Sequence, residues 1–390
     1  MGNKIYDLTN PQKSILLTEE FYKGTNINNI CGTAVIENEI NFDLLKKAIS
    51  IFINNHDSFH LELVLENNEM KQFLNNKNDT FIEIIDIKTM EEINNIEKNM
   101  INHVFDIYNG DTFLVKIFRL PNNSGGFIWN IHHLFADSWS LGIVANDIVR
   151  IYSCLLNGEE VSKNEDFSYL NYIDSEKEYF ASDKFKKDKE YWNNIFNTIP
   201  EQATIPGSLA DSSNNFSPIA KRETFNIDKN MLDKITDFCK SCNVSVFNFF
   251  MAVFAIYIGR VSGKDDFVVG TPILNRTNFN EKNTTGMFIN TAPLRFCIDD
   301  SLDFKSFVSN IAKDSIGMLR HQKYYYQTIL DDLRKNNPKL PNLYNILISY
   351  QVTKAATEKG VNYSTRWIFN GSSTDDLDIH LYDLNSSRKS

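Results

Sequence analysis

The sequence NIHHLFADSWS occupies residues 130–140, and the interpretation of the whole chain starts from it. It follows an apolar run, Phe127 to Ile131, that indicates a buried strand, and it precedes a segment with helical periodicity at residues 141–156. Functional side chains are often placed at such a junction between rigid elements. If the strand runs through both adjacent histidines, their side chains point to opposite faces. One histidine would then face a cavity, and the other would brace the turn.

The residue pattern leaves three interpretations open. The histidine pair is structural, with Asp137 in the N-cap region of the next helix, or one imidazole is a general base or hydrogen-bond partner whose geometry Asp137 fixes. A metal site is the third possibility. Adjacent histidines diverge in a strand and no further ligand cluster lies nearby, so we expect no metal.

Residues 131–140 resemble the HHxxxDGWS signature of the condensation domains of nonribosomal peptide synthetases, within the wider superfamily of chloramphenicol-acetyltransferase-like acyltransferases. Three further segments resemble the LTxxQ, GxPxxNR and GxFxNTxPLR stretches of that family: LTNPQK at residues 8–13, VGTPILNR at 269–276 and GMFINTAPLR at 286–295. They occur in the family's order and span most of the chain.

The resemblance implies a role for each residue of the signature. His133 would lie at an amine substrate, as a base or as a hydrogen-bond partner that positions the amine, and His132 would support the loop. Asp137 resembles the family's structural carboxylate, held by an arginine that matches Arg276. Trp139 is expected to pack rather than react, because a large aromatic residue after a tight loop usually anchors it.

Ser138 departs from the family motif, which usually has glycine at this position. Glycine is favoured where φ is positive or where another group comes close. If the loop needs positive φ here, serine strains it, and we then expect Ser138→Gly to stabilise the protein slightly. The alternative is that Ser138 has an ordinary φ and caps the following helix.

Strands and helices mix in both halves of the chain without strict βαβ alternation, which predicts an α+β or α/β fold with two lobes. We expect an N-terminal lobe at residues 1–165 and a C-terminal lobe at residues 166–390. The resemblance implies that both lobes are chloramphenicol-acetyltransferase-like and form a V, with the histidine motif at their interface and a central tunnel that opens on both sides. It also implies a truncated C-terminal lobe, because family members usually continue past the position of Leu384.

Local patterns also predict individual elements. Asn10 and Pro11 fit the N-cap and first residue of a helix that ends near Gly24. Other expectations are a capping box at Thr89–Glu92, a hairpin of Phe113–Leu120 with Phe127–His133, one partly exposed helix at Asp174–Phe196, a short strand at Thr224–Ile227 and a buried helix at Val244–Ile258.

Composition limits the partners and the compartment. The net charge of −10 argues against nonspecific binding to nucleic acid, which needs a basic surface. The five cysteines are irregularly spaced and include one isolated CxxC at residues 239–242, which favours reduced thiols. The N-terminus has no apolar signal core, and the longest apolar segment is too short to span a bilayer. We therefore expect a cytoplasmic protein with no nucleic-acid or membrane partner.

The resemblance implies a condensation domain that forms an amide between a donor acyl or peptidyl thioester and an acceptor aminoacyl thioester. It implies no directly bound cofactor, substrates carried on the phosphopantetheine of partner carrier proteins, and an adenylation domain as a further partner. The motifs begin almost at Met1, so we expect the donor to arrive in trans, as a fatty acyl or a peptidyl group. The alternatives are a non-catalytic module that only docks carrier proteins and a stand-alone acyltransferase that uses acyl-coenzyme A.

Overall fold

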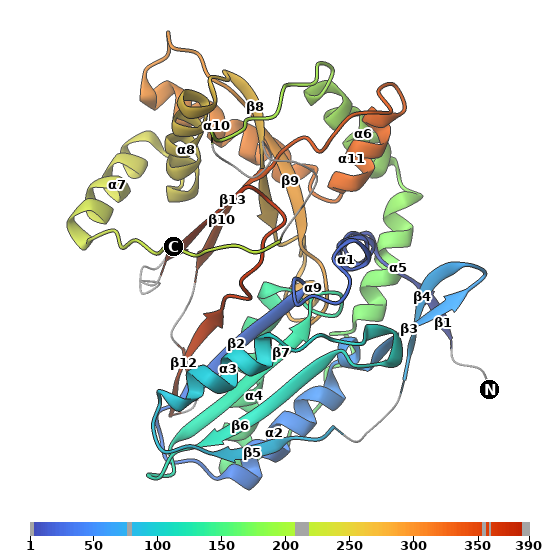
Figure 1. The fold of residues 1–390 in the computed structure, drawn as a ribbon, viewed down its shortest axis with the longest axis vertical. Helices are drawn as coiled ribbons and strands as arrows, with labels where there is room; N and C mark the ends of the chain where they lie inside the picture. Colours follow the sequence, from blue (N-terminus) through green and yellow to red (C-terminus); the bar gives the residue numbers. More distant parts are fainter. Residues whose placement is uncertain (1–3, 76–79, 207–217, 353–355, 359, 384–390) are drawn as a thin grey trace.

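The computed structural model describes residues 4–75, 80–206, 218–352, 356–358 and 360–383. The chain forms a mixed α/β fold with two lobes, the lower and the upper in Figure 1. A six-stranded sheet is the centre of the lower lobe and a four-stranded sheet is the centre of the upper lobe, while a small three-stranded sheet stands beside them. The mixed fold class predicted from the sequence is confirmed.

The elements follow one another as strands and helices in both halves. The first half contains β1 (Ile5–Asp7), α1 (Asn10–Phe21), β2 (Asn29–Ile36), α2 (Phe42–Asn55), β3 (Leu61–Glu66), β4 (Glu69–Leu74), β5 (Glu83–Asp86), α3 (Glu92–Ile101), β6 (Phe113–Arg119), β7 (Gly125–His132) and α4 (Ser138–Leu156). The second half contains α5 (Tyr169–Phe180), α6 (Asp183–Ile195), α7 (Lys229–Cys242), α8 (Val246–Ser262), β8 (Asp266–Ile273), α9 (Phe279–Lys282), β9 (Asn290–Cys297), α10 (Phe304–Arg320), α11 (Tyr326–Arg334), β10 (Ile346–Val352), β11 (Ala356–Glu358), β12 (Val361–Ile368) and β13 (Leu377–Asp383).

Strand β7 lies inside the six-stranded sheet, whose order is β11-β12-β2-β7-β6-β5. It pairs antiparallel with β2 and with β6, which confirms the predicted hairpin of β6 and β7. Trp129 packs in the cluster formed with α2 and α4, whereas Ile128 packs in the cluster formed with α3. Asn130, on the same face as Ile128, donates from Nδ2 to the carbonyl of Met100 at 2.6 Å. Burial on both faces explains why the run before the histidines is almost continuously apolar.

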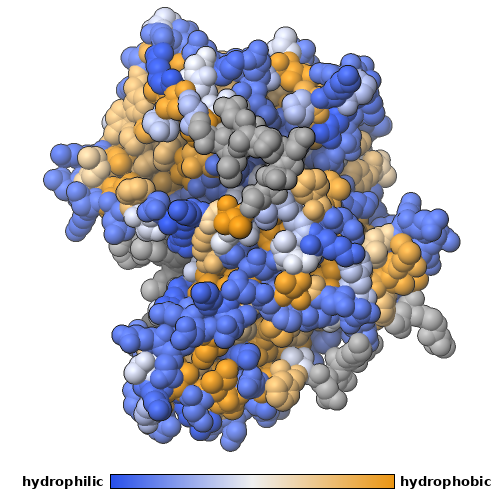
Figure 2. All heavy atoms as spheres, in the orientation of Figure 1, coloured by the Kyte–Doolittle hydropathy of each residue, from blue (hydrophilic) through white to orange (hydrophobic). Residues whose placement is uncertain are grey.

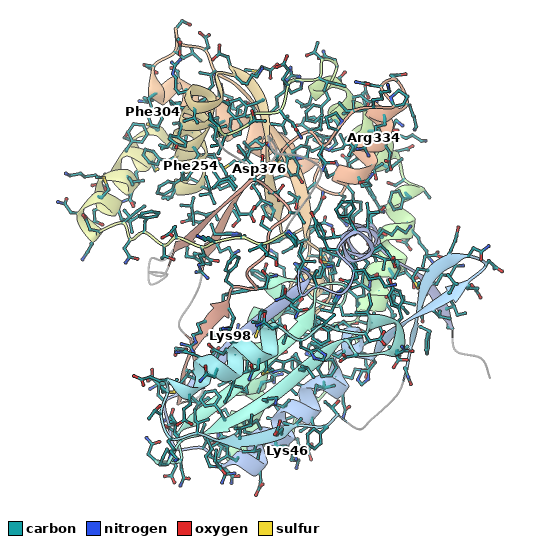
Figure 3. All side chains as sticks on the ribbon, viewed as in Figure 1. Lys46, Lys98, Phe254, Phe304, Arg334 and Asp376 are labelled. Atoms are coloured by element: carbon teal, nitrogen blue, oxygen red, sulfur yellow. The ribbon has the colours of Figure 1, made fainter. Side chains whose placement is uncertain are left out.

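The upper lobe has its own core. Helices α6, α8, α10 and α11 supply side chains that pack with strands β8, β9 and β10 in one apolar cluster, and the four strands run in the order β13-β10-β8-β9. Figure 3 shows how densely side chains fill both lobes, with Lys98 on α3 in the lower lobe and Asp376, just before β13, in the upper lobe. A third cluster, which includes Leu134, Tyr172 and Phe288, contains residues from both halves of the chain.

Two late strands join the sheet of the first lobe. Residues 363–368 of β12 pair antiparallel with residues 36–31 of β2, and β11 pairs with β12. The chain therefore leaves the upper lobe after β10, extends the lower sheet and returns to form β13 (Figure 1). The expected division at residue 165 stays a prediction, and the sheet of residues 1–165 is completed by a segment of the second half.

Several predicted element ends were wrong. The N-cap of α1 is Thr9 rather than Asn10, because Thr9 forms a capping box with Gln12, and the helix ends at Phe21 before Gly24 takes φ +78°. The capping box expected at Thr89–Glu92 is absent, since α3 begins at Glu92 without a side-chain cap.

Two further expectations failed for different reasons. The helix expected over residues 174–196 is two helices, because Ser182 caps the start of α6 by accepting the N–H of Phe185. Residues 224–227 form no strand, and the side chain of Phe225 is 87% exposed. The expectation of a truncated C-terminal lobe concerns residues after 383, which lie outside the described part of the chain.

The long apolar helices are core helices. Among the described residues, α4 is the one helix that is long and apolar enough to cross a membrane by itself, and half of its apolar window is buried in the protein. The α7–α8 pair passes the same test only if its 101° bend is ignored. Figure 2 shows hydrophilic residues over most of the visible face, with apolar groups gathered over α7 and α8. Packing against the sheets accounts for the apolar composition of α4.

Candidate active site

The histidine motif forms the turn between β7 and α4. The strand ends at His132, residues 133–135 turn, and the helix begins at Ser138. Leu134 and Phe135 anchor the turn, with exposed fractions of 0% and 1%. Burial of two such side chains contributes about 1.5–3 kcal/mol each, so the turn has a fixed position relative to the core.

Asp137 is the N-cap of α4, and its side chain is fully buried. Its carboxylate accepts the N–H of Ser140 at 2.9 Å, as an N-cap does. It also accepts the N–H of Phe288 at 3.1 Å and of Ile289 at 3.3 Å, two residues of the second half of the chain. The prediction that Asp137 lies in the N-cap region of the next helix is therefore confirmed.

Arg276 forms the expected ion pair with Asp137. The guanidinium donates to the two carboxylate oxygens at 2.6 and 3.0 Å, and both side chains have 0% exposure. Burial alone raises the pKa of Asp137, but the charge and hydrogen bonds of Arg276, with the N–H groups of Ser140 and Phe288, hold the pKa below its usual value. The carboxylate is charged, so this is a buried bidentate ion pair between the lobes.

Ser140 and Gly286 complete this contact between the two halves of the chain, and neither was predicted from the sequence to be part of the site. The hydroxyl of Ser140 accepts the N–H of Gly286 at 3.0 Å and lies 2.9 Å from Oδ1 of Asp137. Gly286 has φ +147°, and a Cβ there would come within 2.1 Å of the ring of Tyr169. Tyr169 in turn donates to the carbonyl of Met287 at 2.7 Å. The GxFxNT-like segment thus needs glycine at its first position.

His132 is held at both ring nitrogens. Its Nδ1 accepts the N–H of Leu134 at 3.2 Å, so the neutral ring carries its proton on Nε2. Nε2 then donates to the carboxylate of Glu19 at 3.1 Å. The exposed fraction of His132 is 2%, in agreement with a supporting role.

His133 is partly exposed, unlike the buried His132. Its backbone N–H donates to the carbonyl of Asn28 at 2.7 Å, and its Nδ1 is buried without a hydrogen-bond partner among the described residues. Burial lowers the pKa of His133 below the ordinary imidazole value, although the charge of Asp137 opposes the shift. The ring is therefore neutral at pH 7, and one of its two nitrogens carries no proton and can accept a hydrogen bond or a proton.

The two residues after Asp137 differ from expectation in one case. Trp139 anchors the loop, since its Nε1 donates to the carbonyl of Lys282 at 2.8 Å. Ser138 is the first residue of α4 and is not among the residues with positive φ, so the proposed strain is absent. It is not the cap either, because Asp137 has that position. The first turn of a helix has an ordinary negative φ that serine adopts freely.

Glu19 and Asn28 were not identified from the sequence. Glu19 is 6% exposed and Asn28 is 5% exposed, and both contact the motif. The sequence does contain one signal: Glu19 lies seven residues after the buried Gln12 in α1, hence on the same helix face.

Among the described residues, no group of three His, Cys, Asp or Glu side chains could hold a metal ion. None of the five cysteines forms a disulfide.

The chain matches the family described as "Condensation domain" over residues 3–388. It is 35% identical over 387 residues to surfactin synthase subunit 1 of Bacillus subtilis (strain 168), an alignment that covers 97% of this chain and 11% of the relative. A plipastatin synthase subunit of the same organism is 28% identical over 387 residues, covering 98% of this chain and 15% of the relative. The chain thus spans about a tenth to a seventh of the length of these relatives.

Solved structures share the fold. A double mutant of the starter condensation domain of rhizomide synthetase, in complex with C8-CoA and Leu-SNAC, superposes with a TM-score of 0.85 at 20% identity, covering 98% of this chain and 86% of that one. The first condensation domain of the calcium-dependent antibiotic synthetase gives a TM-score of 0.82 at 16% identity, covering 98% of this chain and 89% of that one.

Proposed function

The chain belongs to the condensation domain family, and from this premise we propose that it forms an amide bond between a donor acyl thioester and an acceptor aminoacyl thioester. The observation that carries the proposal is His133: a neutral, half-buried imidazole in the turn that the buried Asp137–Arg276 pair holds in place. Such a ring can accept a proton from an amine only if it is unprotonated, and its lowered pKa keeps it so at pH 7.

In the proposed reaction, the acceptor amine nitrogen attacks the carbonyl carbon of the donor thioester, and a carbon–nitrogen bond forms. The carbon–sulfur bond then breaks, the sulfur leaves as a thiolate, and the proton lost by nitrogen balances the thiolate charge. The neutral ring of His133 accepts a hydrogen bond from the amine, which orients the nitrogen lone pair toward the carbonyl. The lowered pKa makes His133 a weak base, which favours this positioning role over complete proton removal before attack.

The other residues of the motif hold His133 in place. Asp137, Arg276 and Ser140 join the turn to the second lobe, while His132 braces it from the opposite side. Trp139 ties the start of α4 to the α9 segment, and Ser138 continues the helix without strain. We assign these residues to support and His133 to contact with substrate.

The donor is proposed to be an acyl group, with a peptidyl donor as the alternative. A solved structure of the same fold binds C8-CoA and Leu-SNAC, an acyl thioester and an aminoacyl thioester, although its 20% identity supports the fold alone. The relative with 35% identity is surfactin synthase subunit 1, of which this chain spans 11%, and a dimodular nonribosomal peptide synthase is 23% identical. We infer that both substrates arrive on the phosphopantetheine of carrier proteins, that an adenylation domain is a further partner, and that the protein acts in the cytoplasm in antibiotic or other secondary-metabolite synthesis. Neither a nucleic acid nor a membrane is proposed as a partner.

The lobe arrangement is part of the proposal. Residues 1–165 and 166–390 would form two chloramphenicol-acetyltransferase-like lobes that meet in a V around a tunnel leading to His133. Support comes from the two separate cores and from the position of the Asp137–Arg276 pair between residues of both halves.

The test supplies the protein with an acyl-loaded carrier and an aminoacyl-loaded carrier, and follows both by intact-protein mass spectrometry. We expect the acceptor carrier to gain the mass of the acyl group while the donor carrier loses it. Binding of both carriers without mass transfer, in a correctly folded protein, would instead support a docking module. Transfer from free acyl-coenzyme A at the same rate as from the loaded carrier would support a stand-alone acyltransferase.

A further inference from the structure

Helix α1 places a buried carboxylate against the histidine motif. Glu19 is 6% exposed, and a single oxygen, Oε2, accepts from Nε2 of His132 at 3.1 Å and from Nδ2 of Asn28 at 2.8 Å. Burial alone raises the pKa of Glu19, but the hydrogen bonds from His132 and Asn28 hold it below the ordinary value. The group is thus an anion at neutral pH, in a place where an anion needs both donors.

Both partners of Glu19 continue to the backbone that carries His133. His132 uses its other nitrogen, Nδ1, to accept the N–H of Leu134 at 3.2 Å. Asn28 uses its backbone carbonyl oxygen to accept the N–H of His133 at 2.7 Å. The N–H groups of His133 and Leu134 are therefore both fixed by residues that Glu19 holds.

The same arrangement determines the tautomer of His132. A carboxylate next to Nε2 requires a proton on Nε2, and this leaves Nδ1 free to accept from Leu134. With the proton on Nδ1 instead, the Leu134 N–H would face another N–H and lose its partner. An incorrect tautomer would therefore release one side of the turn that holds His133.

We propose that Glu19 is a positioning residue for amide formation: it fixes the tautomer of His132 and the orientation of Asn28, and through them the backbone at His133. The proposal rests on the proposed function of His133. It assigns a role in the reaction to α1, an element that is remote in sequence from the histidine motif.

The kinetic test compares three variants of the same chain with loaded carriers as substrates. Glu19→Met keeps the length of the side chain and removes both acceptor oxygens, whereas Glu19→Gln keeps one oxygen that can accept both hydrogen bonds. Glu20→Gln is the matched control, because Glu20 is exposed on the same helix and accepts from Tyr108 rather than from the motif. We expect Glu19→Met to lower kcat about 10- to 100-fold, since a displacement of about 1 Å can cost 10²-fold.

The other expected values separate positioning from general damage. KM for both carriers should stay within about 2-fold of the parent, because the carriers dock away from a buried residue, and Glu19→Gln should recover most of the lost kcat. Glu20→Gln should match the parent. A Glu19→Met protein with parental kcat, or a Glu19→Gln protein as slow as Glu19→Met, would overturn the proposal while leaving the proposed function intact.

A spectroscopic measurement does not depend on activity. Long-range ¹⁵N–¹H correlation spectra of protein with labelled histidine report which ring nitrogen of His132 carries the proton, with assignment by a His132→Gln variant. We expect the proton on Nε2 in the parent and in Glu19→Gln, and a mixture of tautomers in Glu19→Met. A proton on Nδ1 in the parent would refute the proposal. If Glu19→Met does not fold, the spectra of the parent and of Glu19→Gln still show which ring nitrogen of His132 carries the proton, and a proton on Nδ1 would still refute the proposal. If the parent forms no amide, the proposed function fails, and these spectra alone decide whether Glu19 fixes the ring.

Discussion

Breaking the buried ion pair between Asp137 and Arg276 should destabilise the protein strongly, and more in Asp137→Ala than in Arg276→Ala. In Asp137→Ala, the guanidinium of Arg276 keeps its charge at 0% exposure, which costs about 3–5 kcal/mol, and α4 loses an N-cap worth about 1 kcal/mol. In Arg276→Ala, the carboxylate of Asp137 keeps the N–H groups of Ser140, Phe288 and Ile289. In Asp137→Ala, the guanidinium of Arg276 likewise keeps the oxygens of Ser140, Glu281 and Thr284. The loss of the N-cap is therefore what makes Asp137→Ala the more costly of the two variants. The double variant should lose about 1–3 kcal/mol less than the sum of the single variants, because it leaves no stranded charge.

The assay is urea unfolding followed by fluorescence and by circular dichroism, with coincident transitions required before a free energy is extracted. Arg260→Ala, Asp300→Ala and their double variant form the control cycle, because that ion pair is exposed and should contribute no more than about 1 kcal/mol. Additive losses in the buried cycle, or a coupling no larger than in the exposed one, would show that the Asp137–Arg276 contact does not hold the lobes together.

The pair also has a pH signature. The pKa of Asp137 is lower in the folded protein than the value near 3.9 of an unfolded aspartate, so the folded state binds the proton less tightly. Its contribution to stability is complete above about pH 3.9 and is lost as the pH falls through the folded pKa. Stability of the parent should therefore decrease more steeply in acid than that of Asp137→Ala.

Three further results are expected. His133→Ala should fold normally and lose about 10²-fold in the rate of amide formation, measured by mass transfer between carriers; a folded variant with parental turnover would remove His133 from the reaction. Gly286→Ala should lower the melting temperature clearly, because the added Cβ would lie 2.1 Å from the Tyr169 ring. Gly142→Ala is the control: this position inside α4 has open space for a Cβ, so alanine should raise the melting temperature. Ser138→Gly should cost no more than about 0.5 kcal/mol in urea unfolding, the reverse of the expectation from sequence, because Ser138 is the first residue of α4 and has an ordinary φ.

Local periodicity predicted the elements that build the site. The apolar run before the histidines forms β7, and the helical pattern after them forms α4, because each pattern reports which faces of one continuous segment are buried. Contacts between distant residues have no such pattern. Asp137 and Arg276 are 139 positions apart, and their pairing was expected only from resemblance to the condensation domains.

Long-range exchange of strands was not predicted for the same reason. Strand β12 pairs with β2 across more than 300 positions. Nothing in the sequence of β12 itself identifies β2 as its partner. Turn chemistry explains the smaller errors. Thr9 caps α1 because its hydroxyl accepts the backbone N–H of Gln12 while the side chain of Gln12 accepts the backbone N–H of Thr9. The adjacent Asn10–Pro11 pair is also typical of a helix start, and for this reason the cap was predicted one residue too late.

The buried charges of this site do more to orient the turn that carries His133 than to stabilise the folded protein. A well-packed apolar replacement for a buried ion pair is often as stable as the pair itself. An apolar pair could not, however, receive the N–H groups of Phe288 and Ile289 or the hydroxyl of Ser140, which join the second lobe to the turn in one geometry. Glu19 does the same on the other side of the turn with His132 and Asn28. Two carboxylates from different elements, Glu19 in α1 and Asp137 at the start of α4, therefore fix the turn that carries His133.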